Sequence, residues 1–121
     1  MNNQSDEQAI KEISVAQLND LVDHNVTLVD VREEYEFVEI RADGAKLLPL
    51  DQIPKVSESL PSDEVIYIIC ASGNRSMVAC EYLSARGFSA VNIIGGTIAW
   101  NLAGYKVNSG PVDQSEIFAS P

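Results

Sequence analysis

The sequence has few metal-binding side chains and no long apolar run, and each scarcity excludes a class of protein. It has 2 cysteines and 1 histidine in 121 residues, too few for a zinc site made of protein ligands. A reducing compartment would leave both thiols free, so no structural disulfide is expected. The longest apolar stretch, Val65 to Ala71, is far too short to span a bilayer. We therefore expect no bound metal and no membrane association.

Basic residues are also scarce: 8 Lys and Arg face 18 Asp and Glu, for a formal charge of -10. This field repels phosphate backbones, so nucleic-acid binding is not expected. It also repels small anions, so any anion site must depend on local backbone donors and a nearby arginine. The polar start, Met1 to Glu7, lacks the features of a signal peptide, and we expect a cytoplasmic protein.

The length and composition suit one folded domain, with 45% hydrophobic and 21% charged residues. We expect a flexible N-terminal segment over residues 1–9, a domain over residues 10–107, and a loose C-terminal tail over residues 108–121 that has little periodicity. Without an evident exposed apolar stripe, a small acidic domain is expected to be a monomer.

Apolar runs alternate along this domain with segments of helical periodicity. The runs predict strands at residues 10–13, 26–31, 46–48, 65–69 and 91–94. Helical spacing and end signals predict helices at residues 15–23, 32–37, 51–60, 76–86 and 97–103. Ser14 and Gln17 have the pattern of a capping box at the first helix. The alternation predicts an α/β fold, with a mainly parallel sheet and helices on both faces.

One segment carries chemistry: residues 70–76, Cys-Ala-Ser-Gly-Asn-Arg-Ser, which leave the strongest predicted strand and enter a predicted helix. In an open α/β sheet, ligands bind beyond the carboxyl ends of strands, where the next helix presents unpaired N–H groups. Gly73 permits a positive φ, and the small Ala71 and Ser72 let successive amides converge on one point. We expect an anion site there, with the Cys70 sulfur near its centre.

Such a site would activate a thiol. A free cysteine has a pKa of about 8.5, which amides, a helix N-terminus and an arginine can lower by one to several units. Arg75 can hold an oxyanion with paired hydrogen bonds, and Ser76 can add a hydroxyl donor. The constellation is a nucleophile in an anion-binding loop, and it requires no metal or organic cofactor.

Structural explanations compete for the same residues. A cysteine that ends an apolar strand is often simply buried, and Arg75 taken alone is typical of a solvated helix start. The loop context favours a reactive Cys70. Cys80 lies among apolar helix residues and is explained by packing. Nothing places His24 beside Cys70, so a cysteine-histidine hydrolase is a poor fit.

Residues 10–107 resemble a rhodanese-like domain. The segments that carry the resemblance, in order, are Leu28 to Glu33 with Glu36-Phe37, Gly44-Ala45 with Leu48-Pro49-Leu50, the Cys70 loop, and Asn92 to Gly96 with Trp100 and Gly104-Tyr105. The resemblance implies a rhodanese-like fold with a five-stranded sheet. It also implies a thiosulfate sulfurtransferase, which takes sulfane sulfur from thiosulfate or a persulfide donor. A Cys70 persulfide then passes this sulfur to cyanide, a thiol or a partner protein.

The same resemblance assigns Cys70 as nucleophile. It implies that the backbone of Ala71 to Arg75 cradles the terminal sulfur. With the hydroxyl donor Ser76 added, the expected substrate-binding residues are Ala71, Ser72, Gly73, Asn74, Arg75 and Ser76. Asp30 and Arg32 match a family pair near the carboxyl edge of the sheet, for which a structural ion pair is an equally good explanation. The segment Ile40 to Asp43 departs from the Gly-His-Ile run that many members have there, which leaves the acceptor open.

Two alternatives to a sulfurtransferase stay open. The first is a phosphatase or arsenate reductase with the same cysteine loop; these relatives use seven residues from cysteine to arginine, whereas Cys70 to Arg75 is six, as in the sulfurtransferases. The second is a non-catalytic rhodanese-like binding module. Modules of that kind commonly lack the cysteine, which is present here.

Overall fold

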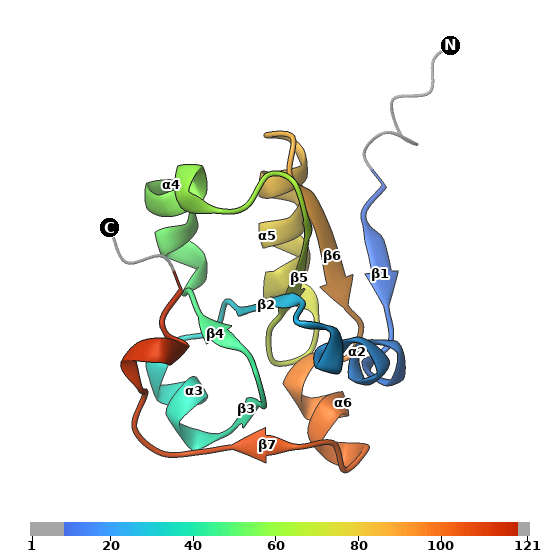
Figure 1. Cartoon of the computed structure of the whole chain (residues 1–121), viewed down its shortest axis with the longest axis vertical. Helices are drawn as coiled ribbons and strands as arrows, with labels where there is room; N and C mark the ends of the chain where they lie inside the picture. The colour runs from blue at the N-terminus through green and yellow to red at the C-terminus, as the bar shows by residue number, and fades with distance from the viewer. Residues whose placement is uncertain (1–8, 119–121) are drawn as a thin grey trace.

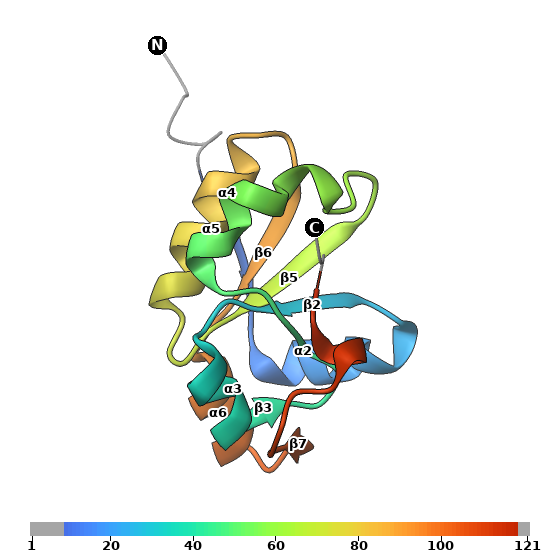
Figure 2. The same cartoon turned by 90° about the vertical axis from the view of Figure 1, so that its left-hand side faces the viewer.

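The computed structural model describes residues 9–118 and has an α/β architecture (Figures 1 and 2). Its strands are β1 (Lys11–Ile13), β2 (Thr27–Asp30), β3 (Arg41–Ala42), β4 (Lys46–Leu47), β5 (Val65–Ile69), β6 (Ser89–Ile93) and β7 (Val107–Asn108). Its α-helices are α2 (Val15–Leu21), α3 (Glu34–Glu39), α4 (Ile53–Val56), α5 (Asn74–Ser84) and α6 (Gly96–Leu102). Short 3-10 helices are η1 (Val22–His24), η2 (Leu50–Gln52), η3 (Ser57–Ser59) and η4 (Gln114–Glu116). Among residues 9–118, no helix has the length and hydropathy of a transmembrane span.

Five strands form one sheet in the order β1-β6-β5-β2-β4, and all neighbouring strands are parallel. The predicted five-stranded parallel sheet is therefore confirmed. A separate antiparallel pair joins β3 to β7. Because β5 lies at the centre of the large sheet, the loop that follows it opens at the middle of the carboxyl edge, where α/β folds place their ligands.

The helices cover both faces of the sheet, as predicted. Alternate residues of β5 point to opposite faces. Ile66 and Ile68 are completely buried in a cluster with residues of α4 and α5. Ile69 belongs to a second cluster, which contains Leu18 of α2 and Trp100 of α6. Burial on both faces explains why this strand reads as a continuous apolar run.

Most predicted strands and helices are present with slightly shifted ends. The capping box is confirmed: the Gln17 amide donates to Ser14 Oγ at 3.1 Å, and the Ser14 amide donates to Gln17 Oε1 at 2.9 Å. The single helix predicted over residues 51–60 is wrong. That stretch is split into η2, α4 and η3, because Pro54 has no amide proton and stands in the first turn of α4.

The C-terminal segment corrects another expectation, since residues 108–118 are not a loose tail. In Figure 1 this segment runs along the bottom of the view as β7 and turns back toward β4. Asn108 pairs with Arg41 of β3, and Ile117 forms an isolated bridge with Leu47 of β4. Residues 119–121 lie outside the described residues. So do residues 1–8, and the flexible N-terminal segment stays a prediction.

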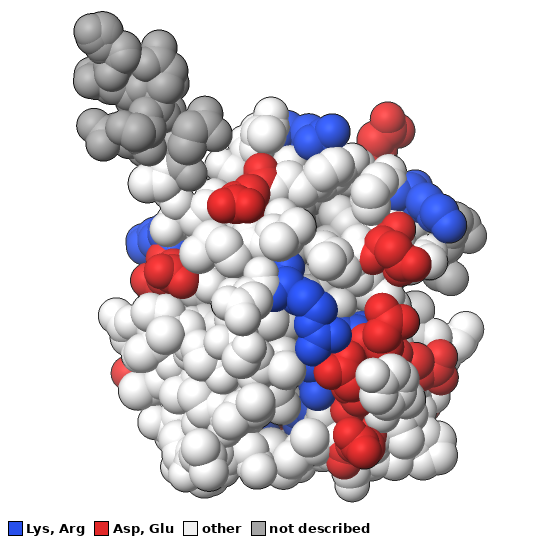
Figure 3. Space-filling view, turned by 180° about the vertical axis from the view of Figure 1, so that it is seen from behind, with Lys and Arg blue, Asp and Glu red and all other residues white. Residues whose placement is uncertain are grey.

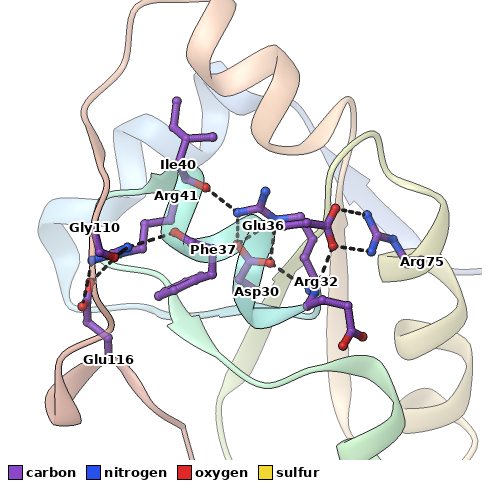
Figure 4. A network of polar contacts seen from close by, with 10 residues as sticks. Asp30, Arg32, Glu36, Phe37, Ile40, Arg41, Arg75, Gly110 and Glu116 are labelled. Atoms are coloured by element: carbon purple, nitrogen blue, oxygen red, sulfur yellow. Dashed lines mark hydrogen bonds and ion pairs between the residues drawn. The ribbon is translucent and has the colours of Figure 1, made fainter.

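Arg41 anchors residues 108–118. It lies in the segment Ile40 to Asp43, which departs from the pattern of the resembled family. Arg41 is 4% exposed and donates to Glu116 Oε2 at 2.7 Å and Oε1 at 3.0 Å (Figure 4). It also donates to the carbonyl oxygens of Phe37 and Gly110, both at 2.9 Å. Local periodicity gives no sign of the contacts to Gly110 and Glu116, which lie about seventy positions from Arg41.

Candidate active site

The Cys70 loop leaves β5 and enters α5, as the sequence predicts. Gly73 is the N-cap of α5 and has a φ of 111°. An L side chain rarely adopts this conformation, so glycine lets the chain turn into the helix without strain. The helix begins at Asn74, two residues before its predicted start, so the amides of the loop and of the first helical turn are close together.

These amides point toward the Cys70 sulfur. The Gly73 amide donates to Cys70 Sγ at 3.1 Å, and Ser76 Oγ lies 3.2 Å from the same sulfur. Burial of Cys70, which is 1% exposed, raises the pKa of its thiol. Hydrogen bonds from the Ser76 hydroxyl and from the amides of Ser76, Gly73 and Ser72 outweigh burial, so the net pKa lies below its usual value. The site favours a thiolate.

The Ser76 hydroxyl is held by a network that the sequence reasoning missed. Its single proton has two acceptors within hydrogen-bond distance, the Cys70 sulfur and Asn92 Oδ1. The Asn92 side-chain amide donates to Glu12 Oε2 at 2.8 Å and to the Gly73 carbonyl at 3.3 Å, and this fixes which end of Asn92 faces Ser76. The only sequence signal was that Asn92 begins one of the segments that carry the family resemblance.

The start of α6 supports the other side of the loop. The Thr97 amide donates to the Cys70 carbonyl at 2.8 Å, and the Ile98 amide donates to the Ala71 carbonyl at 3.1 Å. A side chain at Gly96 would collide with the carbonyl oxygens of both Cys70 and Ala71. The second glycine of the Gly-Gly pair is therefore required by a close approach of two backbones, which holds the cysteine loop in place.

Arg75 is already engaged by a carboxylate. Its Nη1 and Nη2 atoms lie 2.8 Å and 2.9 Å from the two carboxylate oxygens of Glu36 (Figure 4). The hydrogen bonds from Arg75 lower the pKa of Glu36 to about 2, against the opposing effect of burial. The sequence reasoning did not assign Glu36 to the site, although Glu36-Phe37 was among the resembling segments. Anion binding by Arg75 stays a prediction.

Asp30 and Arg32 form a buried ion pair beside the site. Arg32 Nη2 donates to Asp30 Oδ2 at 2.9 Å and to the Ile40 carbonyl at 2.7 Å. Asp30 is completely buried and Arg32 is 4% exposed. The pair ties the end of β2 to the end of α3, which supports the structural explanation of these two residues. Arg32 also lines a cavity that borders Ala71.

The remaining candidate residues lie apart from this chemistry. Cys80 is completely buried in the core, and burial raises the pKa of its thiol to about 12, so the packing explanation is confirmed. His24 ends η1, ahead of β2 and at the opposite edge of the sheet from Cys70. Within residues 9–118, no three His, Cys, Asp or Glu side chains are grouped closely enough to hold a metal ion.

Comparisons with known proteins agree with this geometry. A family profile described as "Rhodanese-like domain" matches residues 14–103. The "Putative sulfurtransferase YtwF" of Bacillus subtilis is 42% identical over 93 residues, which cover 75% of this chain and 90% of that protein. A protein of Allochromatium vinosum named "Sulfurtransferase" is 40% identical over 77 residues, 63% of this chain and 72% of its own length. The crystal structure of a rhodanese-like domain protein from Staphylococcus aureus has a TM-score of 0.71 at 40% identity, and covers 75% of this chain and 91% of its own.

Proposed function

The chain belongs to the rhodanese-like domain family, and we propose that it is a sulfurtransferase in which Cys70 carries sulfur as a persulfide. The donor is thiosulfate or a persulfide, and the acceptor is cyanide, a thiol or a partner protein. One observation carries the proposal: backbone amides and the Ser76 hydroxyl converge on a buried cysteine sulfur and lower its pKa. This arrangement stabilises the thiolate that must attack and, later, leave.

The first half of the cycle loads the sulfur. The Cys70 thiolate attacks the sulfane sulfur of the donor, and a bond forms between Sγ and that sulfur. The bond between the sulfane sulfur and the rest of the donor breaks, and its electron pair leaves with sulfite or with a thiolate. The outer sulfur of the new persulfide carries negative charge. We propose that the backbone amides from Ala71 to Arg75 donate hydrogen bonds to it.

The second half of the cycle transfers the sulfur from Cys70 to the acceptor. An acceptor nucleophile attacks the outer sulfur, the Sγ–S bond breaks, and the electron pair returns to Cys70 as a thiolate. Electrons balance between donor and acceptor, so the cycle needs no metal or organic cofactor. A monomeric state, a cytoplasmic location and the absence of nucleic-acid and membrane partners stay predictions.

Intact-mass measurement tests this function. Protein freed of reducing agent is incubated with thiosulfate or with cysteine persulfide, and the wild type is expected to gain one sulfur atom that cyanide removes. Cys70→Ser should gain none, whereas the matched variant Cys80→Ser should gain it like the wild type, because Cys80 is buried in the core.

Three results would contradict the proposal or assign another function. A wild type that stays unmodified by both donors rules out the persulfide. Hydrolysis of an aryl phosphate that depends on Cys70 supports the phosphatase alternative. A partner complex that persists in Cys70→Ala, with no sulfur transfer by either form, supports the binding module.

A further inference from the structure

The helix that supports the cysteine loop presents apolar side chains to solvent. Ile98 and Leu102 of α6 are 55% and 81% exposed, and Ile94, just before the helix, is 51% exposed. We call these three residues the α6 face. Ile98 and Leu102 are four positions apart and so lie on one side of the helix. No residue of α6 is charged, and exposed apolar groups gathered beside a site mark a place for a partner.

A mostly apolar cavity of about 180 Å³ lies between the α6 face and the Cys70 loop. Its lining includes Ile98 and Leu102 from α6, Ile40 from the end of α3, and Ala71, which directly follows the cysteine. The volume is below the roughly 300–1,000 Å³ of pockets that enclose a small molecule, and suits a single inserted side chain. Thr97 also lines the cavity, and its buried hydroxyl has no hydrogen-bond partner in the part of the chain described.

The other side of the loop is acidic. Glu33, Glu34 and Glu39 of the α3 region are exposed, and none of them has an ion-pair partner among residues 9–118. The carboxylate of Glu36 is paired with the guanidinium of Arg75. Figure 3 looks onto this side of the molecule, where acidic side chains gather around α3 beside basic ones, and the α6 region is free of charged side chains. We call Glu33, Glu34 and Glu39 the α3 edge.

We propose that the α6 face and the α3 edge together dock the sulfur acceptor, a polypeptide whose thiol is flanked by basic and apolar side chains. This inference rests on the proposed function and names its acceptor. An apolar side chain enters the cavity beside Ala71, and Lys or Arg groups face the α3 edge. A second copy of this chain is a poor occupant, because two molecules of formal charge -10 repel each other.

The step is a transfer between two sulfur atoms. The acceptor thiol loses its proton to solvent, and its thiolate attacks the outer sulfur of the Cys70 persulfide. A bond forms between the acceptor sulfur and that outer sulfur. The Sγ–S bond breaks and its electron pair stays on Cys70, so the acceptor becomes a persulfide without any oxidant.

Single-turnover transfer to synthetic peptides tests the docking surface. Cys70 is loaded with cysteine persulfide, desalted, and mixed with a peptide that has one cysteine between leucines and lysines, with its counterpart in which glutamates replace the lysines, or with free cysteine. We expect the lysine peptide to accept sulfur about tenfold faster than the glutamate peptide at low salt, and the difference to shrink at about 0.5 M salt, because screening weakens charge pairing.

Matched variants locate the effect on the surface. Leu102→Ser and Glu34→Lys are each expected to lower the ratio of the lysine-peptide rate to the free-cysteine rate by about fivefold. Val65→Ser also replaces an exposed apolar residue, at the start of β5, and Glu58→Lys repeats the charge reversal in η3; both should leave that ratio unchanged.

The outcomes separate this inference from the proposed function. Equal rates for the two peptides, or equal effects of Leu102→Ser and Val65→Ser, overturn the docking surface while the sulfurtransferase stands. If Cys70 takes no sulfur at all, the function fails. Docking is then decided by fluorescence anisotropy of a lysine peptide with serine in place of cysteine: weaker binding to Leu102→Ser supports it, and unchanged binding overturns it. A dimer that Leu102→Ser dissolves, seen by sedimentation, would assign the face to a second copy and also overturn it.

Discussion

Glu36 and Arg75 form a bidentate ion pair between α3 and α5. Arg75 Nη1 lies 2.8 Å from Glu36 Oε1, and Arg75 Nη2 lies 2.9 Å from Glu36 Oε2. The arginine that ends the cysteine loop is therefore neutralised before any donor arrives. The side chain of Glu36 is 17% exposed and that of Arg75 is 39% exposed, so the pair is partly open to solvent. A donor that carries two negative charges, such as thiosulfate, meets a compensated cation.

Glu36→Gln is expected to raise kcat/KM for thiosulfate by about three- to tenfold, since it removes the compensating charge and keeps the side-chain shape. Cyanide-dependent turnover with thiosulfate measures this, and the rate with cysteine persulfide, which carries less negative charge than thiosulfate, should change less. Glu81→Gln makes the same change at an exposed position of α5, the helix of Arg75, and serves as control. An unchanged or lower thiosulfate rate in Glu36→Gln would show that the pair assists anion binding instead.

Ser76→Ala is expected to slow alkylation of Cys70 at neutral pH by roughly threefold or more, because the thiolate loses a hydrogen bond. The Ser76 hydroxyl helps to lower the pKa of Cys70, so its removal raises that pKa and moves the rate–pH curve to higher pH. Wild type and variant should converge at alkaline pH, where both thiols are ionised. Rates of reaction with iodoacetamide measure this directly. Burial raises the pKa of Cys80 to about 12, so the Cys80 thiol does not react at neutral pH. Ser84→Ala, at the other end of α5, should leave the curve in place.

Arg41→Met is expected to lower the free energy of unfolding by about 3 kcal/mol, because it leaves Glu116 and two carbonyl groups without their donor. Urea denaturation measures the loss, and the segment from residue 109 onward should become sensitive to protease. Arg86→Met is a matched control: Arg86 also lies over an aromatic ring, that of Tyr82, but on the surface, and its loss should cost less than about 0.5 kcal/mol. Equal losses in the two variants would contradict the anchoring role of Arg41.

Gly96→Ala is expected to lower stability more than Gly104→Ala does. Both glycines have a positive φ, which costs a non-glycine residue about 1 kcal/mol or more. Of the two, only at Gly96 would the added methyl group press on a backbone, that of Cys70 and Ala71, and overpacking adds about 1–3 kcal/mol. Thermal unfolding gives the difference, and the Cys70 alkylation rate should change in Gly96→Ala alone. Equal stability of the two variants would mean that the Cys70 loop moves aside for the added methyl group at little cost in free energy of unfolding.

The local part of the site was readable from the sequence. An apolar run that ends in Cys70 and is followed by Gly73 and a helical pattern predicts a strand, a turn of positive φ and a helix start, and the structure has all three. The capping box at Ser14 was readable for the same reason, since its partners are three residues apart. The helix predicted over residues 51–60 is wrong, because Pro54 cannot donate a backbone hydrogen bond and stands in the first turn of α4, where a new helix begins.

The sequence by itself determined the alternation of strands and helices and the position of a nucleophile at the carboxyl end of the central strand, because those features follow from neighbouring residues. Only the tertiary structure decided what each charged side chain contacts. Glu36 reaches Arg75 across 39 positions and Arg41 reaches Glu116 across 75, and such pairs form only where strand order and helix packing bring distant segments together. For the same reason Asn92, which lies on the strand next to β5, meets the Ser76 hydroxyl beside the Cys70 sulfur.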